Sequence, residues 1–194
     1  MTFILPHLKR EEVVFNDKLV IRKGFLEYRN NTGTPSSYTR LRVDRQDASA
    51  VLIYNTESQK IILTRQYRYA IASRTAEPIL EIMAGKVDPG EDPLQTGIRE
   101  AIEECGYRIL PGNIQHLASF FASPGYTSEK YNLYFAKVSN ADKINNGGGL
   151  EAEHESIEVV ELDPAVFLHM ADNGLLEDGK TLTVALLARN RELL

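Results

Sequence analysis

The sequence predicts an α/β protein in which a domain of strands and helices is preceded by a small antiparallel sheet. Residues 1–45 alternate polar and apolar side chains between turn signals, as half-buried strands do. After residue 48, short apolar runs are separated by turns, and a well-marked helix interrupts them. Two further helical segments end the chain. This order favours an α/β domain with an added β module.

The N-terminal segment is predicted to hold strands that no helix separates. The predicted strands are residues 11–15, 19–29 and 38–45. Turn-forming Asn, Asp, Gly and Pro residues lie between them. A sheet this small is stable only when it packs on another surface. We therefore expect residues 1–45 to form a separate antiparallel module and residues 46–194 to form the main domain.

The helix at residues 93–105 is the best-marked element of the main domain. Asp92 suits its N-cap, Pro93 its first position, and Gly106 a left-handed end. The other elements of this domain are predicted from the spacing of their apolar residues. The predicted strands are residues 50–54, 60–64, 79–83, 116–122, 131–138 and 158–162, and the further helices are residues 164–171 and 181–191.

Composition excludes several classes of protein. The formal net charge is −5, which argues against a broad basic face for nucleic acid but not against a phosphate substrate that metal ions neutralise. The single cysteine, Cys105, excludes an intramolecular disulfide and fits a reducing compartment. No apolar run approaches the roughly 20 residues that span a bilayer. We expect a cytoplasmic protein with no membrane and no nucleic-acid partner.

The predicted helix carries three carboxylates on one face. Glu100, Glu103 and Glu104 stand at i, i+3 and i+4, where like charges destabilise a helix unless something compensates them. Divalent cations with oxygen ligands would compensate them, and Mg²⁺ is the common choice where phosphate is handled. Arg99 can reach Glu103 and orient it. Taken alone, the same pattern also fits a solvated acidic surface with one ion pair.

A longer motif surrounds these carboxylates, with the spacing G-x5-E-x7-R-E-x2-E-E-x-G. Its residues are Gly85, Glu91, Arg99, Glu100, Glu103, Glu104 and Gly106. The motif resembles the Nudix box, a loop–helix–loop that holds metal on a diphosphate in that family. Tyr107 departs from the aliphatic residue that the family prefers there, and Ala101 is a small version of the preferred apolar residue. Neither departure affects a ligand position.

The resemblance implies a set of roles within and beside the box. Glu100, Glu104, Glu155 and the Ala84 carbonyl are expected to hold two or three Mg²⁺ ions, with Mn²⁺ as the alternative. Arg99 and Glu103 are expected to support catalysis. An α/β/α sandwich with a mixed sheet is the fold that the resemblance implies for the main domain.

Segments outside the box resemble the branch of the family that hydrolyses nucleoside-diphosphate sugars. These segments are residues 65–68, 80–85, 123–125 and 147–159. They are similar to ADP-ribose pyrophosphatases and especially to GDP-mannose pyrophosphatases. By position, Glu153 matches the general base proposed in that branch, and Glu151 is its rival because the spacing is uncertain by a residue. Without the resemblance, a disordered acidic loop explains the same residues.

The resemblance also suggests substrate contacts. Arg68 is expected to bind the diphosphate, for which a guanidinium fork is suited, and Glu81 to orient a water or brace the site. In this branch the N-terminal module is exchanged between the subunits of a homodimer and supplies nucleobase contacts. Arg40 and Tyr28 are the candidates for those contacts, Tyr28 by stacking.

We therefore expect Mg²⁺-dependent hydrolysis of GDP-mannose or ADP-ribose to a nucleoside monophosphate and a sugar phosphate. One alternative is a protein that senses a nucleotide sugar without cutting it, but every glutamate of the box is present and no DNA-binding segment is left over. The other is a pyrophosphatase that removes modified nucleoside triphosphates. Such chains are typically shorter and lack the N-terminal sheet.

Overall fold

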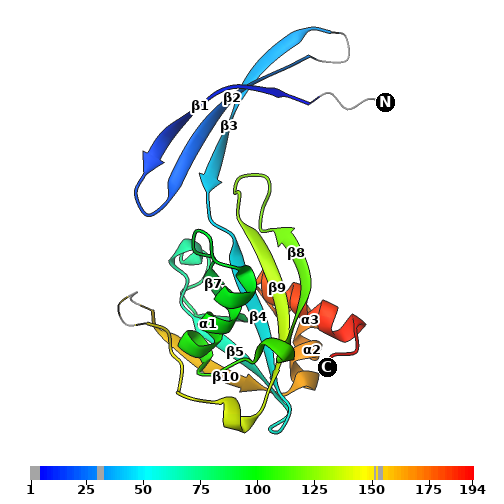
Figure 1. Cartoon of the computed structure of the whole chain (residues 1–194). Coiled ribbons are helices and arrows are strands. Elements are labelled where there is room, and N and C mark those ends of the chain that lie inside the picture. Colours follow the sequence, from blue (N-terminus) through cyan, green and yellow to red (C-terminus); the bar gives the residue numbers. More distant parts are fainter. Residues whose placement is uncertain (1–4, 30–32, 151, 153–154) are drawn as a thin grey trace. The chain divides into compact units, whose positions relative to one another are not determined.

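A computed structural model describes residues 5–29, 33–150, 152 and 155–194, and it divides the chain into two compact units (Figure 1). One unit comprises Met1–Asp47 and Phe121–Lys130, and the other comprises Ala48–Phe120 and Tyr131–Leu194. Residues 121–130 fall within the expected main domain of residues 46–194. In the structure this segment belongs to the N-terminal unit.

The N-terminal unit is built on an antiparallel sheet in the order β1-β2-β3. Its strands are β1 (His7–Asn16), β2 (Val20–Arg29) and β3 (Pro35–Asp44). β1 begins earlier than predicted because its first residues still pair with the far half of β2, as Leu8 does with Leu26. Among the described residues of this unit, none forms a helix, so the sheet has no helical cover of its own.

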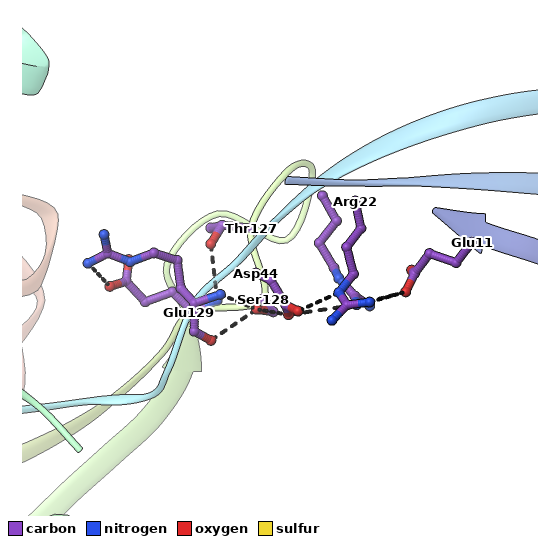
Figure 2. A network of polar contacts seen from close by, with 8 residues as sticks. Glu11, Arg22, Asp44, Thr127, Ser128 and Glu129 are labelled. Atoms are coloured by element: carbon purple, nitrogen blue, oxygen red, sulfur yellow. Dashed lines mark hydrogen bonds and ion pairs between the residues drawn. The ribbon is translucent and has the colours of Figure 1, made fainter. Parts of the chain in front are cut away.

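A network of charged side chains crosses this sheet (Figure 2). Arg22 on β2 donates from Nε to Asp44 Oδ2 on β3 at 2.7 Å, and its Nη1 lies 3.5 Å from Glu11 Oε2 on β1. The hydrogen bond from Arg22 holds the pKa of Asp44 below its ordinary value. The network therefore ties all three strands together across one face.

The same network holds residues 121–130 against β3 (Figure 2). Arg45 Nη2 lies 3.1 Å from Glu129 Oε1, and Ser128 Oγ donates to Asp44 Oδ1 at 3.5 Å. The backbone adds hydrogen bonds from Val43 N–H to the Tyr126 carbonyl (2.7 Å) and from Ser128 N–H to the Val43 carbonyl (3.1 Å). This explains why a segment far away in the sequence belongs to the N-terminal unit.

The second unit contains a seven-stranded mixed sheet in the order β10-β5-β4-β9-β8, with β6 (Ile79–Glu81) beside β5 and β7 (Met83–Lys86) beside β4. Its central strand β4 (Ala48–Asn55) runs parallel to β9 (Lys130–Val138) and antiparallel to β5 (Lys60–Gln66). The outer strands are β8 (Ile114–Phe121) and β10 (Ile157–Leu162). Short 3-10 helices lie at Tyr69–Ile71, Pro111–Asn113 and Asn140–Asp142.

Helices cover both faces of this sheet (Figure 1). The helices are α1 (Pro93–Cys105), α2 (Pro164–Asp172) and α3 (Gly179–Asn190). Successive residues of β4 belong to different cores, because side chains alternate across a strand. Leu52 belongs to the core shared with α2 and α3, and Val51 to the core shared with α1. The predicted α/β/α sandwich with a mixed sheet and a preceding antiparallel sheet is confirmed.

Cys105 lies at the end of α1 and is fully buried in the α1 core. Burial raises the pKa of its thiol well above the ordinary value, so the group is a packed neutral side chain.

In the described ranges, no helix is both long enough and apolar enough to cross a membrane.

The prediction of one strand at residues 79–83 is wrong, because two strands occupy this region. β6 (Ile79–Glu81) pairs with β5, and β7 (Met83–Lys86) pairs with β4. The break falls at Ile82, whose N–H donates to Thr181 Oγ1 at 2.8 Å instead of to a neighbouring strand. A hydrogen bond to a residue so distant in sequence could not be read from the local pattern.

Candidate active site

The helix α1 is fixed by the local signals that the sequence contains. The Asp92 carboxylate accepts a hydrogen bond from Leu94 N–H at 3.0 Å, and Pro93 occupies the first helical position. Gly106 ends the helix in the left-handed conformation, with φ of 78°. Ala101 and Cys105 are buried against the sheet. These contacts fix which way the carboxylates on the rest of the helix point.

Glu100 and Glu104 point from α1 onto strand β7. Glu104 is only 5% exposed, and its Oε2 accepts a hydrogen bond from Ala84 N–H at 3.4 Å. Glu100 lies so close to Gly85 that a Cβ on residue 85 would overlap the carboxylate. A side chain at position 85 would therefore displace the Glu100 carboxylate from its place against β7.

The two carboxylates have strongly perturbed ionisation. Burial, together with the neighbouring charges of Glu100 and Glu155, raises the pKa of Glu104 to about 8. Burial also raises the pKa of Glu100 to about 7, although the Arg99 charge opposes the shift. Desolvated carboxylates that repel one another favour either protonation or a bound cation. Strongly perturbed ionisable groups cluster at functional sites.

Arg99 holds the outer side of this cluster. Its Nη1 lies 2.8 Å from Glu103 Oε2 and 2.8 Å from Glu100 Oε1, and its Nε lies 3.4 Å from Glu91 Oε1. The guanidinium thus joins three glutamates of the motif. These contacts are those of a brace that orients carboxylates, and the catalytic assignments of Arg99 and Glu103 stay predictions.

Glycines 147–149 are anchored at the end of α1. Gly148 N–H donates to the Glu104 carbonyl at 2.9 Å, and Gly149 N–H donates to the Glu103 carbonyl at 3.1 Å. These bonds satisfy carbonyls that a helix end leaves without partners. All three glycines have positive φ, and a Cβ on Gly147 would overlap the Glu104 carbonyl. The glycines serve close packing against the helix, a role that composition did not reveal.

This anchoring places Glu155 beside the motif carboxylates. Glu155 Oε2 accepts a hydrogen bond from Leu150 N–H at 3.3 Å, and a Cβ on Gly149 would lie 2.7 Å from that oxygen. The charge of Glu155 contributes to the raised pKa of both Glu100 and Glu104. The predicted base Glu153 and its rival Glu151 lie outside the described residues.

Arg68 and Glu81 form a second charged group close to Glu104. Glu81 is 4% exposed, and its Oε2 lies 2.8 Å from Arg68 Nε and 2.7 Å from Arg68 Nη2. The charge of Arg68 also counters the raised pKa of Glu104. The other oxygen of Glu81 lies 2.8 Å from Nζ of Lys180, a buried residue that sequence reasoning missed because no motif marks it.

Tyr28 and Arg40 lie in the N-terminal unit, where both contact Tyr38. The rings of Tyr28 and Tyr38 meet edge to face at 5.8 Å between centroids. The Arg40 guanidinium carbon lies 4.5 Å from the Tyr38 ring centroid. Tyr38 was also missed, although β-strand alternation places it on the same face as Arg40.

The donor chemistry around α1 suits a hard divalent cation. Glu100, Glu104 and Glu155 supply carboxylate oxygens, and Ala84 lies against them through its bond to Glu104. In the part of the chain that the structure describes, no three acidic, His or Cys side chains are gathered into a ready-made metal cluster.

Comparison with known proteins identifies a family whose model covers most of this chain. The NUDIX domain model matches residues 44–184. A GDP-mannose pyrophosphatase of Citrobacter koseri is 31% identical over 176 residues, which are 90% of this chain and 90% of that protein. A GDP-mannose pyrophosphatase of Escherichia coli K12 is 30% identical over 176 residues, with the same coverage of 90% on both sides.

The fold is also similar to a solved structure, that of an ADP compounds hydrolase. The TM-score is 0.72 at 22% identity, over 95% of this chain and 92% of the other. The family match covers the sheet, the helix α1 and the carboxylates that β7 and the glycines 147–149 hold in place. The chain therefore belongs to the NUDIX family.

Proposed function

We propose that this chain, a pyrophosphatase of the NUDIX family, hydrolyses the diphosphate of a nucleoside-diphosphate sugar with the help of Mg²⁺. The products are a nucleoside monophosphate and a sugar phosphate. The observation that carries the proposal is a pair of mutually repelling carboxylates, the partly buried Glu100 and the buried Glu104, with the Arg68 guanidinium acting on Glu104. Such a site suits a cation together with an anionic substrate.

Each residue of the site has a proposed role. Glu100, Glu104, Glu155 and the Ala84 carbonyl would hold two or three Mg²⁺ ions, or Mn²⁺ in their place. When bound, such ions neutralise phosphate charge and make water a better nucleophile near neutral pH. Arg68 binds the oxygens of the diphosphate.

The proposed general base is Glu153, which takes a proton from the attacking water. The water oxygen bonds to one phosphorus, and the bridging P–O bond breaks with its electron pair on the departing phosphate. Arg99 and Glu103 keep the carboxylates of α1 in their orientation during this step.

GDP-mannose is the first candidate substrate. The two relatives described above carry the name GDP-mannose pyrophosphatase and align over 90% of this chain. ADP-ribose is the second candidate, on the resemblance of residues 123–125 to that branch. A cytoplasmic site of action stays a prediction, and the one cysteine, which is buried and free, is compatible with it.

Substrate choice is tested by measuring phosphate release from a panel, with alkaline phosphatase and Mg²⁺ present. The panel contains GDP-mannose, ADP-ribose, ADP-glucose, UDP-glucose, NADH and diadenosine polyphosphates. We expect GDP-mannose to give the highest kcat/KM. The Glu104→Gln variant, which removes one carboxylate proposed to bind the metal, should lose at least about a hundredfold in kcat and keep its fold.

Near-normal activity of Glu104→Gln would contradict the metal assignment. Silence of the wild-type protein across the panel with both Mg²⁺ and Mn²⁺ would support the sensor alternative. Preference for a modified nucleoside triphosphate, added as a last substrate, would support the pool-cleaning alternative.

The base assignment is tested by comparing Glu153→Gln with Glu151→Gln. We expect Glu153→Gln to lower kcat by about a hundredfold or more with little change in KM, because general-base catalysis acts in the transition state. Glu151→Gln serves as the matched control two positions away in the sequence. A larger effect of Glu151→Gln would move the base to that residue.

We also propose that the chain is a homodimer in which the N-terminal sheet is exchanged and contributes to substrate binding. The sheet carries apolar side chains that are about half exposed. These include Leu8, Val13, Phe15 and Leu41, with exposures of 51%, 48%, 51% and 58%. A second chain would cover such a surface. The aromatic and cationic group of Tyr28, Tyr38 and Arg40 would then contact the nucleobase.

Light scattering tests the assembly. We expect a particle of twice the chain mass of 21.8 kDa. The variant Phe15→Glu/Leu41→Glu should shift the protein toward the monomer, since both changes place charge in the proposed interface. Leu175→Glu is the control, because Leu175 is 56% exposed but lies outside the sheet. A wild-type monomer at working concentrations would contradict the proposal.

The raised pKa values of Glu100 and Glu104, about 7 and about 8, predict a pH-dependent stability in the metal-free protein. The folded state holds more protons than the unfolded state between about pH 4.3 and pH 8. The free energy of unfolding should therefore be greatest at the acidic end and fall as pH rises through the folded pKa values.

The measurement is urea unfolding with EDTA between pH 5 and pH 8.5, with solution conditions otherwise constant. Excess Mg²⁺ should raise stability more at pH 8 than at pH 6, because the ion binds ionised carboxylates. Glu100→Gln/Glu104→Gln should flatten the pH profile. An unchanged slope in this variant would refute the assignment of the two groups.

A further inference from the structure

Lys180 is a buried lysine that the proposed reaction does not yet use. It is 5% exposed, and its Nζ lies 2.8 Å from Glu81 Oε1 and 3.0 Å from Asp178 Oδ1. Burial lowers the pKa of Lys180, but the charges of Asp178 and Glu81 outweigh this and raise it. The side chain is therefore a buried ammonium between two carboxylates.

The first turn of α3 holds Lys180 in this position. Asp178 caps the helix by accepting hydrogen bonds from Thr181 N–H at 2.9 Å and Thr181 Oγ1 at 2.5 Å. Thr181 Oγ1 in turn accepts the Ile82 N–H at 2.8 Å. Helix α3 thus contacts the break between β6 and β7 at two points, the Ile82 backbone N–H and the Glu81 side chain.

Glu81 passes this constraint on to Arg68. One oxygen of its carboxylate contacts Lys180, and the other accepts from Arg68 Nε and lies 2.7 Å from Arg68 Nη2. Charges alternate from Asp178 through Lys180 and Glu81 to Arg68. The Arg68 side chain, 40% exposed, is the end of this series that reaches solvent.

We infer that Lys180 is a positioning residue of the reaction, because it fixes Glu81 and thereby the Arg68 guanidinium that takes the diphosphate. The inference rests on the proposed function, in which Arg68 binds substrate. A buried ion pair adds little to stability on balance, whereas removing one partner leaves the other charge unpaired. Without Lys180, Oε1 of Glu81 would lose its charged partner while Oε2 stays paired with Arg68, so the carboxylate could turn and carry the guanidinium with it.

The experiment compares wild type, Lys180→Met, Arg68→Met and the double variant, with GDP-mannose and Mg²⁺ in steady-state kinetics. Loss of one charge-assisted contact predicts that Lys180→Met raises KM by about tenfold, with a smaller change in kcat. Arg68→Met should raise KM at least as much. In the Arg68→Met background, Lys180→Met should add less than about twofold, because both changes remove the same contact.

Two further variants separate positioning from general damage. Lys180→Gln keeps a hydrogen-bond donor but no charge, and it replaces Lys180→Met if circular dichroism shows that the methionine variant does not fold. Lys60→Met is the matched control, since Lys60 pairs at 3.8 Å with Asp163 on the surface of the same unit. Its KM should equal that of wild type.

Folded Lys180 variants with unchanged KM would overturn the inference, as would KM effects that multiply in the double variant. Both results need an active wild-type protein. If wild type fails to hydrolyse any nucleotide sugar of the panel, the proposed function fails instead, so the two failures are distinguishable.

Discussion

The packing of the buried Glu104 and the partly buried Glu100 against strand β7 is the constraint on which the rest of the site depends. Carboxylates removed from water favour their neutral form, and here their pKa values rise to about 7 and about 8. The helix can bring them there only because Gly85 leaves room for Glu100. Burial thus makes the ionised carboxylates unfavourable without a counter-charge, which a divalent cation would supply.

Cationic side chains flank these carboxylates without neutralising them fully. Arg99 joins Glu91, Glu100 and Glu103 within the motif. On another side, Lys180 and Arg68 share Glu81, which is why Arg68 keeps a defined position while part of it stays exposed. In both arrangements an arginine is held in place by carboxylates other than Glu104. Among the described residues, Glu104 therefore has no direct ion pair.

The N-terminal unit shows a comparable use of charge. Arg22, Asp44 and Glu11 tie its strands together, and Ser128 and Glu129 join the segment 121–130 to them. That segment contains residues 123–125, one of the stretches similar to nucleotide-sugar pyrophosphatases. A substitution in the N-terminal strands would therefore change the contacts that hold this segment, although the two are far apart in the sequence.

The sequence by itself determined the elements and the identity of the motif, because these depend on neighbours within a few positions. Asp92, Pro93 and Gly106 set the ends of α1, and the spacing of Glu100 and Glu104 put them on one face. Only the tertiary structure decided the break at Ile82, the packing role of glycines 147–149 and the position of Lys180. Each depends on contacts between residues far apart in the chain, and no local period records such contacts.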